Sequence, residues 1–214
     1  MQPGVPNCFL LMMTSNVRLE NLWRRLRLSG DASVWHARLL RCYEETQRAY
    51  HTLQHLDECL LILDEAKATS LIAKPDLIEM ALWFHDAVYD PQGHENEELS
   101  AQMALEALGN TETSSEVARL IMLTKSHQPG DGADDAWIID IDLAIFAQPM
   151  ERVLEYERQI RAEYAWVPES VYGEKRAEIL TGFLKRQQIY LTAWARDQFE
   201  TRARENLHAL IDSI

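Results

Sequence analysis

Apolar residues recur at intervals of three and four along most of this chain, which is the spacing of one face of an α-helix. Residues 16–28 illustrate it, with Leu19, Leu22 and Leu26 on one side of the predicted helix. No segment alternates convincingly between apolar and polar residues at every second position, as a half-buried strand would. The pattern therefore predicts an all-α protein.

Turn-forming residues divide this periodic sequence into separate helices. Pro75 lies where proline is favoured at the first position of a helix, and residues 90–93 (Asp-Pro-Gln-Gly) are typical of a turn. Residues 127–135 contain one proline and two glycines and form the clearest loop. The predicted helices cover about residues 16–28, 32–47, 52–63, 76–89, 95–108, 115–126, 137–146, 149–164 and 174–212, the last as two helices or one bent helix.

The length and composition of the chain favour one globular domain. Its 214 residues suffice for one well-filled core, and 47% hydrophobic with 26% charged residues is ordinary for a soluble protein. The N-terminus lacks the basic segment and the longer apolar run of a secretory signal. We expect residues 1–15 to form a loose leader and residues 16–214 to form a single-domain helical bundle. No stretch approaches the length of a membrane span, so we expect a cytoplasmic protein without a membrane partner.

The net charge and the number of cysteines limit which binding partners and which cysteine roles are expected. The formal net charge of −13 argues against a nucleic-acid polymer as partner, because phosphate contacts need clustered Lys and Arg. A small anionic substrate remains compatible, since a bound cation inverts the local field. Cys8, Cys42 and Cys59 are too few for a disulfide framework, and we interpret them as buried or idle thiols. The long apolar C-terminal helices are compatible with a homodimer.

The adjacent residues His85 and Asp86 are the main candidates for chemistry. They lie in an apolar segment predicted to be helical. Neighbouring side chains on a helix point about 100° apart, so both can reach one ion. An imidazole nitrogen and a carboxylate oxygen together suit a divalent metal such as Zn, Mn, Fe or Ni.

Two further pairs of residues are candidates for the same site. His51 and His55 are four positions apart, which places both on one face of a helix. The zinc-protease motif is excluded, because Thr52 stands where that motif needs Glu. Asp140 and Asp142 interrupt an apolar run, where an unpaired carboxylate is costly to bury. Either one caps the helix while the other binds a metal, or both act as caps.

Taken in order, these residues resemble the H…HD…D signature of the HD-domain superfamily of metal-dependent phosphohydrolases. The order is His55, then His85-Asp86, then Asp142, and the match is closest to a small branch of predicted phosphohydrolases. The resemblance covers residues 16–214. Other segments that look like that branch are Tyr50-His51, Trp83-Phe84 before the HD pair, Glu95–Ala101, Thr124–His127, Asp140–Leu143, Phe183–Tyr190 and Ala203–Leu207.

This resemblance implies a helical bundle of the HD type that hydrolyses a small phosphomonoester or nucleotide with a divalent metal. The metal would be Mn, Co, Ni, Fe, Zn or Mg, and we expect one ion per chain. The implied metal ligands are His55, His85, Asp86 and Asp142. Asp140 and His94 are the alternative metal ligands or supporting residues.

The resemblance also implies roles for residues around the metal. His51 is the candidate general acid, and Asp86 is the second candidate catalytic residue. Lys125, His127 and Glu97 are candidate substrate contacts. Each of two residues has an open alternative. Lys125 could simply be a solvated surface residue, and Glu97 could simply interact favourably with a helix N-terminus.

Two other functions are compatible with the same residues. One is a non-catalytic module that binds a nucleotide through a retained metal site, which would show tight binding without turnover. The other is a diiron oxygenase built on HD-type helices. It needs a larger ligand set, which this chain reaches only by enlisting both His94 and His127.

Overall fold

The structure, a computed structural model, describes residues 8–214, with side chains from residue 15 onward. Within that range every regular element is a helix, which confirms the predicted all-α class. None of the helices in residues 8–214 is long and apolar enough to cross a membrane. The elements are α1 (Cys8–Arg25), α2 (Ala32–Tyr43), α3 (Leu53–Lys67), α4 (Pro75–Phe84), α5 (Asn96–Leu108), α6 (Glu112–Ser126), α7 (Asp135–Asp142), the 3-10 helix η1 (Leu143–Ala147), α8 (Met150–Glu163), α9 (Glu169–Leu184), α10 (Ala193–Ala195), the π-helix η2 (Arg196–Glu200) and α11 (Thr201–Ser213).

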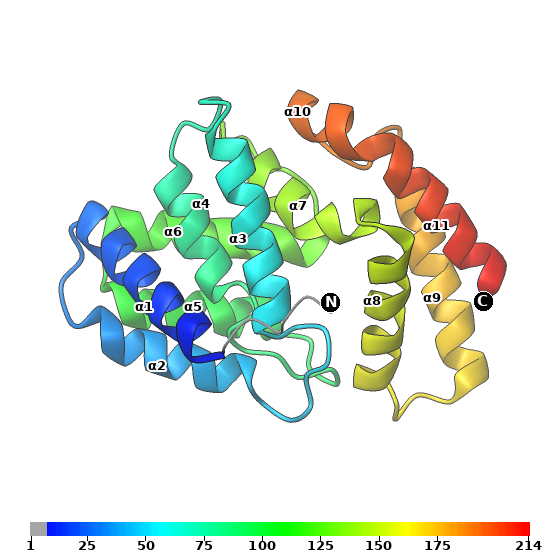
Figure 1. The fold of residues 1–214 in the computed structure, drawn as a ribbon, viewed down its shortest axis with the longest axis horizontal. Helices are drawn as coiled ribbons and strands as arrows, with labels where there is room; N and C mark the ends of the chain where they lie inside the picture. Colours follow the sequence, from blue (N-terminus) through cyan, green and yellow to red (C-terminus); the bar gives the residue numbers. More distant parts are fainter. Residues whose placement is uncertain (1–7) are drawn as a thin grey trace, which may run out of the picture.

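Helix α4 is the central helix of the N-terminal group of helices, which Figure 1 shows in blue to green. Its residues from Ile78 to Phe84 are all buried. A helix that is apolar nearly all round packs in the interior, and α4 accordingly packs against α1, α3, α5, α6 and α7. Pro75 occupies the first helical position, as the sequence predicted. The segment that follows α4 therefore emerges from the middle of the core.

Helices α8, α9 and α11 form the other side of the molecule, drawn in yellow to red in Figure 1. The short helix η1 connects the two sides, since both α8 and α11 pack on it. Asn206 of α11 donates hydrogen bonds to the carbonyl oxygens of Phe146 and Gln148, and the Tyr190 hydroxyl donates to that of Leu143. These bonds pair carbonyl groups that a 3-10 turn leaves without an α-helical partner.

Helix α4 ends at Phe84, whereas the periodicity predicted a helix to residue 89. The reason lies outside the helix. Arg48 donates hydrogen bonds to the carbonyl oxygens of Asp86 and Ala87, and the Ser100 hydroxyl pairs with the backbone of Val88. Side chains thus take the backbone groups that a further helical turn would use. Likewise α2 ends at Tyr43 rather than at residue 47, and the turn that follows it contains Arg48.

Helix α1 begins at Cys8, so residues 8–15, predicted to lie in a loose leader, are helical. Leu and Met, which dominate residues 9–13, are strong helix formers, and no Gly or Pro occurs between Pro6 and Gly30. The prediction for residues 1–7 lies outside the described residues. At the other end, the pattern predicted as two helices or one bent helix forms α9 and, after a break at residues 185–192, the consecutive helices α10, η2 and α11.

Candidate metal centre

Side chains from α3, α7 and the turn after α4 meet at one point in the core. His55 lies in the first turn of α3, His85 and Asp86 directly follow α4, and Asp142 is the last residue of α7. The His55 Nε2 atom lies 3.2 Å from His85 Nε2 and 3.1 Å from Asp142 Oδ1. The Asp86 Oδ2 atom lies 3.0 Å from His85 Nε2 and 3.5 Å from His55 Nε2. The structure therefore brings together all four residues that the sequence proposed as ligands.

The spacing of these donor atoms fits ligands around one ion. Ligands about 2.1 Å from a metal lie about 3.0 Å apart along an octahedral edge and about 3.4 Å apart along a tetrahedral one. The observed separations run from 3.0 Å to the 3.6 Å between His85 Nε2 and Asp142 Oδ1. Imidazole lone pairs and carboxylate oxygens are all acceptors, so this arrangement needs a proton or a cation between them.

A backbone contact orients His85 toward this centre. Its Nδ1–H group donates to the carbonyl oxygen of Leu82, at 2.9 Å, one turn earlier in the chain. The Nε2 atom is therefore the ring nitrogen that faces His55 and Asp86. Metal-binding histidines typically have such a second contact, which fixes the tautomer and the ring orientation.

The charges at this centre favour a cation. Burial lowers the pKa of His85, but the neighbouring Asp86 and Asp142 carboxylates outweigh it and raise that pKa well above its ordinary value. Burial likewise opposes ionisation of Asp142, yet hydrogen bonds from His127 and His55 hold the pKa of this carboxyl well below its ordinary value. Burial opposes ionisation of Asp86 too, but the charge of His85 lowers the pKa of that carboxyl. Both carboxylates thus stay ionised in the interior and require positive charge beside them.

Cys59 lies one helical turn after His55 and joins the group. Its Sγ atom is 3.8 Å from both Nδ1 and Nε2 of His55, and burial raises the pKa of the thiol well above its ordinary value. Ligand atoms of His55, Cys59, His85 and Asp142 all lie within 4.8 Å of one another, so this group could hold a metal ion. The sequence predicted a buried or idle thiol here; Cys59 is buried, but its position beside His55 was not predicted. The four-residue spacing from His55 was the signal that could have placed it on the same helix face.

His127 contacts the same aspartate from another side. Its Nε2 atom lies 3.0 Å from Asp142 Oδ2, the oxygen that His55 does not contact. His127 caps the C-terminus of α6 with a φ of +49°, a left-handed conformation uncommon for residues other than glycine. Arg186 donates a hydrogen bond to the His127 carbonyl oxygen, at 3.1 Å. These contacts on both sides hold His127 in place.

His51 precedes α3, and a carboxylate from a distant part of the sequence fixes the orientation of its ring. The Nδ1 atom lies 2.8 Å from Oε2 of Glu163, which also accepts a hydrogen bond from the Tyr89 hydroxyl at 2.8 Å. The Tyr89 ring stacks on the His51 ring with centroids 4.0 Å apart. The other Glu163 oxygen accepts the backbone N–H groups of Ala49, Tyr50 and His51. No local pattern in the sequence links Glu163 to His51, so this contact was not predicted.

The contact between Glu163 and His51 is an ion pair. Burial opposes the charge on both groups, but the hydrogen bond and charge of His51 lower the pKa of Glu163 to about 2. Burial also lowers the pKa of His51, while the charges of Asp86 and Glu163 raise it to a value above the ordinary one. With Nδ1 bound to Glu163, the Nε2 atom is the position from which this ring can exchange a proton.

A cavity of about 630 Å³ opens beside the centre. His51, Asp86, His127 and Asp142 line its polar end, whereas His55 and His85 lie behind them and are almost fully buried. Most of the remaining wall comes from η1, α8, α9 and the segment between α8 and α9, and it is mostly apolar and aromatic. A cavity of this size, with a few converging polar groups, is typical of a small-molecule site.

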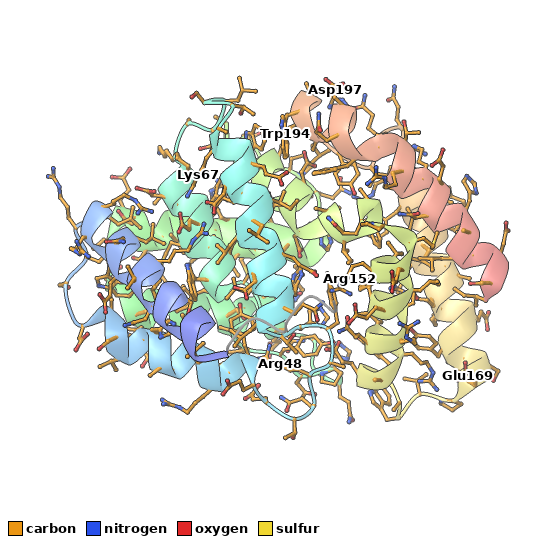
Figure 2. The ribbon with its side chains drawn as sticks, viewed as in Figure 1. Arg48, Lys67, Arg152, Glu169, Trp194 and Asp197 are labelled. Carbon is orange, nitrogen blue, oxygen red and sulfur yellow. The ribbon has the colours of Figure 1, made fainter. Side chains whose placement is uncertain are left out.

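Arg48, labelled in Figure 2, holds the backbone at two site residues. Its guanidinium group donates hydrogen bonds to the carbonyl oxygens of His51 and Asp86, at 3.0 and 2.6 Å, and also to that of Ala87. The side chain is completely buried. A single arginine in a turn has no distinguishing sequence pattern, so this role of Arg48 was not predicted.

Arg152, also labelled in Figure 2, links the two sides of the molecule near the cavity. From α8 it pairs with Glu58 of α3, and the closest nitrogen and oxygen are 2.6 Å apart. Its guanidinium group also lies over the Tyr50 ring, 5.8 Å from the ring centroid. These contacts hold α8, which carries Glu163, against the helix that carries His55.

The structure separates the roles of Asp140 and Asp142. The two carboxylate oxygens of Asp140 accept hydrogen bonds from the backbone N–H groups of Leu191 and Thr192, each at 2.7 Å. Burial raises the pKa of this carboxyl to about 6, although those hydrogen bonds oppose the shift. Asp140 therefore anchors the chain before α10, while Asp142 faces the histidine cluster.

The other predicted residues divide between the cavity and the surface. Glu97 lines the cavity, whereas Lys125 and His94 are exposed and lie outside its lining. Lys125 donates hydrogen bonds to Glu98 at 2.5 Å and to the His94 carbonyl oxygen at 2.8 Å. The structure thus does not bring Lys125 or His94 to the centre.

Comparison of this chain with models of protein families, with curated proteins and with solved structures finds no match. The resemblance to the HD-domain superfamily, which rests on the order and spacing of the motif residues, stays a prediction. We therefore infer the function from the site itself.

Proposed function

We propose that this protein is a metal-dependent phosphohydrolase that acts on a small phosphomonoester or nucleotide. The observation that carries the proposal is the convergence of His55, His85, Asp86 and Asp142 at one end of a ligand-sized cavity. His51 lines the same end of the cavity, held by a buried carboxylate. A cation site, an oriented acid and a cavity are the parts that phosphate ester hydrolysis requires.

In this proposal two histidines and two aspartates hold one divalent cation. Asp86 is a better fourth ligand than Cys59, because its Oδ2 atom faces both imidazole Nε2 atoms at 3.0 and 3.5 Å. The Cys59 sulfur lies 3.8 Å from each nitrogen of the His55 ring. Such a nitrogen and oxygen set suits Mn, Fe, Co, Ni or Zn, whereas Mg prefers oxygen ligands alone. When bound, the cation would lower the pKa of a water molecule and neutralise charge on the phosphate.

The residues around the centre supply the proton transfers. His51 gives the proton on Nε2 to the alcohol oxygen as the phosphorus–oxygen ester bond breaks. Glu163 orients the ring through Nδ1, and together with Asp86 its charge raises the pKa of His51, which favours the protonated form that a general acid needs. A positioned general acid contributes typically about 10²–10⁴-fold to the rate. Asp86, which lines the cavity, accepts the proton of the attacking water.

The experiment is a hydrolysis assay with different metals. The purified chain is loaded with Mn, Fe, Co, Ni, Zn or Mg, and phosphate release is measured from p-nitrophenyl phosphate, glucose 6-phosphate and adenosine monophosphate. We expect turnover with at least one metal, and a loss of at least about 100-fold in H85A and D86N. H208A, which alters an exposed histidine of α11, is the matched control. Phosphate release no faster than that of H85A with every metal would exclude the proposed function.

The diiron oxygenase is the weaker alternative on geometric grounds. It requires both His94 and His127 as additional ligands. His127 contacts Asp142, but His94 is exposed in the turn before α5 and does not line the cavity. The ligand set around the centre therefore favours one cation.

A further inference from the structure

The cavity wall away from the metal centre has little capacity for hydrogen bonding. Phe146, Tyr156, Ile160 and Phe183 line it, and among the described lining residues there is no Ser, Asn or Gln. The one threonine, Thr124, uses its hydroxyl to donate to the carbonyl oxygen of Ile121. Sugar hydroxyl groups or nucleobase edges placed against this wall would lose hydrogen bonds to water with few replacements.

Apolar surface continues to the mouth of the cavity. Trp166, Val171 and Ile179 line the cavity, and yet they are 54%, 47% and 52% exposed to solvent. Large apolar side chains gathered at an exposed rim are typical of a surface that binds an apolar partner or ligand. In this case the rim is continuous with the interior wall, so one elongated apolar group can contact both.

The lysine and arginine side chains that line the cavity offer no free positive charge for a second phosphate group, and Glu97 in the same lining adds negative charge. Arg176 is already paired with Glu157 and lies over the Tyr156 ring. Lys175 pairs with Glu178 at 2.8 Å. Among the described lining residues, these two are the only lysine or arginine side chains. A second or third phosphate would therefore find no unpaired lysine or arginine away from the centre.

Two phenol groups offer limited polar contacts. Tyr50 and Tyr172 line the cavity, and their hydroxyl oxygens are buried without a hydrogen-bond partner in the described part of the chain. A buried hydroxyl normally has such a partner. Each can bond a single polar atom of a ligand that is otherwise apolar.

We propose that the substrate is a monophosphate ester of an apolar alcohol, either aromatic or alkyl. This inference rests on the proposed phosphohydrolase function and narrows it. The phosphate lies at the metal centre, and the apolar part extends along Phe146 and Phe183 toward Trp166 at the mouth. The tyrosine hydroxyls bond the few polar atoms of the ligand.

Steady-state kinetics test this substrate class. The full chain, loaded with the metal that gives the highest turnover, is assayed with decyl phosphate, 1-naphthyl phosphate, glucose 6-phosphate and adenosine monophosphate. We expect kcat/KM for the decyl or naphthyl ester to exceed that for the two polar esters by at least about tenfold, because more apolar surface leaves water. The alkyl and aryl esters together distinguish the two kinds of apolar alcohol. Equal values across the four esters, or a preference for either polar ester, would overturn the inference.

A variant at the mouth tests the wall directly. I179E places a charge among the exposed apolar side chains, where folding should tolerate it because Ile179 is half exposed. We expect the ratio of kcat/KM for decyl phosphate to that for glucose 6-phosphate to fall by about tenfold. L61E is the matched control, since Leu61 is an exposed apolar residue of α3 outside the cavity lining. An unchanged ratio in I179E would contradict the proposed position of the apolar group.

A binding measurement separates this inference from the proposed function. Decylphosphonate and methylphosphonate carry a carbon–phosphorus bond in place of the ester bond, so calorimetric titration of the metal-loaded chain measures affinity without turnover. We expect decylphosphonate to bind at least about tenfold more tightly than methylphosphonate. If decylphosphonate binds more tightly but no ester is hydrolysed, the ligand class would be supported and the proposed phosphohydrolase function would be excluded. Equal or undetectable binding of the two phosphonates would overturn the ligand class, whatever the hydrolysis assay shows.

Discussion

Glu163 accepts a hydrogen bond from the His51 ring, 2.8 Å from Nδ1 to Oε2, although the two residues lie 112 positions apart. The same carboxylate also accepts three backbone N–H groups of the segment that contains His51 and the hydroxyl of Tyr89. Helix α8 therefore sets the position and charge of the candidate acid, while the turn before α3 supplies the residue itself. Several consequences of this arrangement can be measured.

Removing the charge of Glu163 should weaken His51 as a general acid without causing loss of the bound metal. In E163Q we expect kcat to fall about 10- to 100-fold with KM changed less than about twofold, because one of the two carboxylates that raise the His51 pKa loses its charge while Asp86 stays. The alkaline limb of the pH–rate profile should move to lower pH. Steady-state kinetics across that limb test this, with E151Q, an exposed glutamate of α8, as control. A lower kcat with an unmoved limb would assign Glu163 a structural role only.

The ion pair also makes stability depend on pH. The pKa of Glu163 is about 2 when folded and 4.5 ordinarily, so its stabilising effect is complete above about pH 4.5 and is lost as the pH falls toward 2. The raised pKa of His51 acts in the opposite direction. Its contribution is complete below about pH 6.5 and is lost as the pH rises through the folded value.

The free energy of unfolding should therefore differ most between the wild-type chain and E163Q from about pH 4.5 to 6.5. One carboxyl whose pKa shifts this far contributes on the order of 3 kcal/mol. Urea unfolding followed by circular dichroism at several pH values measures the difference. A difference that stays constant from about pH 3 to 8 would mean that the pair is not ionised.

Metal binding should depend on His55 and not on His94. We expect H55A to lose the bound divalent ion and the rise in Tm that the ion causes, because removal of one of four ligands weakens the site severely. H94A should keep both, since His94 is exposed away from the cavity. Metal analysis and thermal unfolding with and without added Mn measure these effects. Half the metal content in H94A would instead indicate a second ion.

Substitutions of Asp140 and Asp142 should have opposite effects on stability and on metal content. D140N weakens the pairing with the backbone of Leu191 and Thr192, so we expect it to lower the free energy of unfolding by about 1–3 kcal/mol and to keep the metal. D142N should lose the metal but stay folded. Urea unfolding together with metal analysis of both variants tests this. Metal loss in D140N with retention in D142N would reverse the assignment.

Replacing Arg48 should destabilise the protein even when lysine, which keeps the positive charge, takes its place. In R48K the lysine has no planar fork to bond the carbonyl oxygens of His51, Asp86 and Ala87 together, so buried acceptors lose their donors. We expect a loss of about 2–4 kcal/mol in the free energy of unfolding. Urea denaturation measures it, and R41K, at an exposed position of α2, is the control. A loss below about 0.5 kcal/mol would show that solvent replaces these bonds.

The sequence by itself determined the helical class and most helix positions, because the three-and-four spacing of apolar residues is a local property of the chain. It also drew attention to the histidines, to Asp86 and to the pair Asp140 and Asp142, because polar residues in apolar segments stand out without any knowledge of the fold. The choice of Asp142 as the ligand came from the resemblance to the HD-domain signature. The ends of the helices were less predictable. Helix α4 ends early because Arg48 takes its following carbonyl groups, and that contact spans 38 positions.

Only the tertiary structure decided which of these residues meet and what surrounds them. Periodicity tells which face of a helix is buried but not which helix it packs against, so neither the link from Glu163 to His51 nor the apolar wall from α8 and α9 was visible in the sequence. Asp140 and Asp142 lie in the same apolar segment, and their local surroundings in the sequence do not separate their roles. They differ in the folded chain because the backbone of Leu191 and Thr192 reaches one of them and the histidines reach the other.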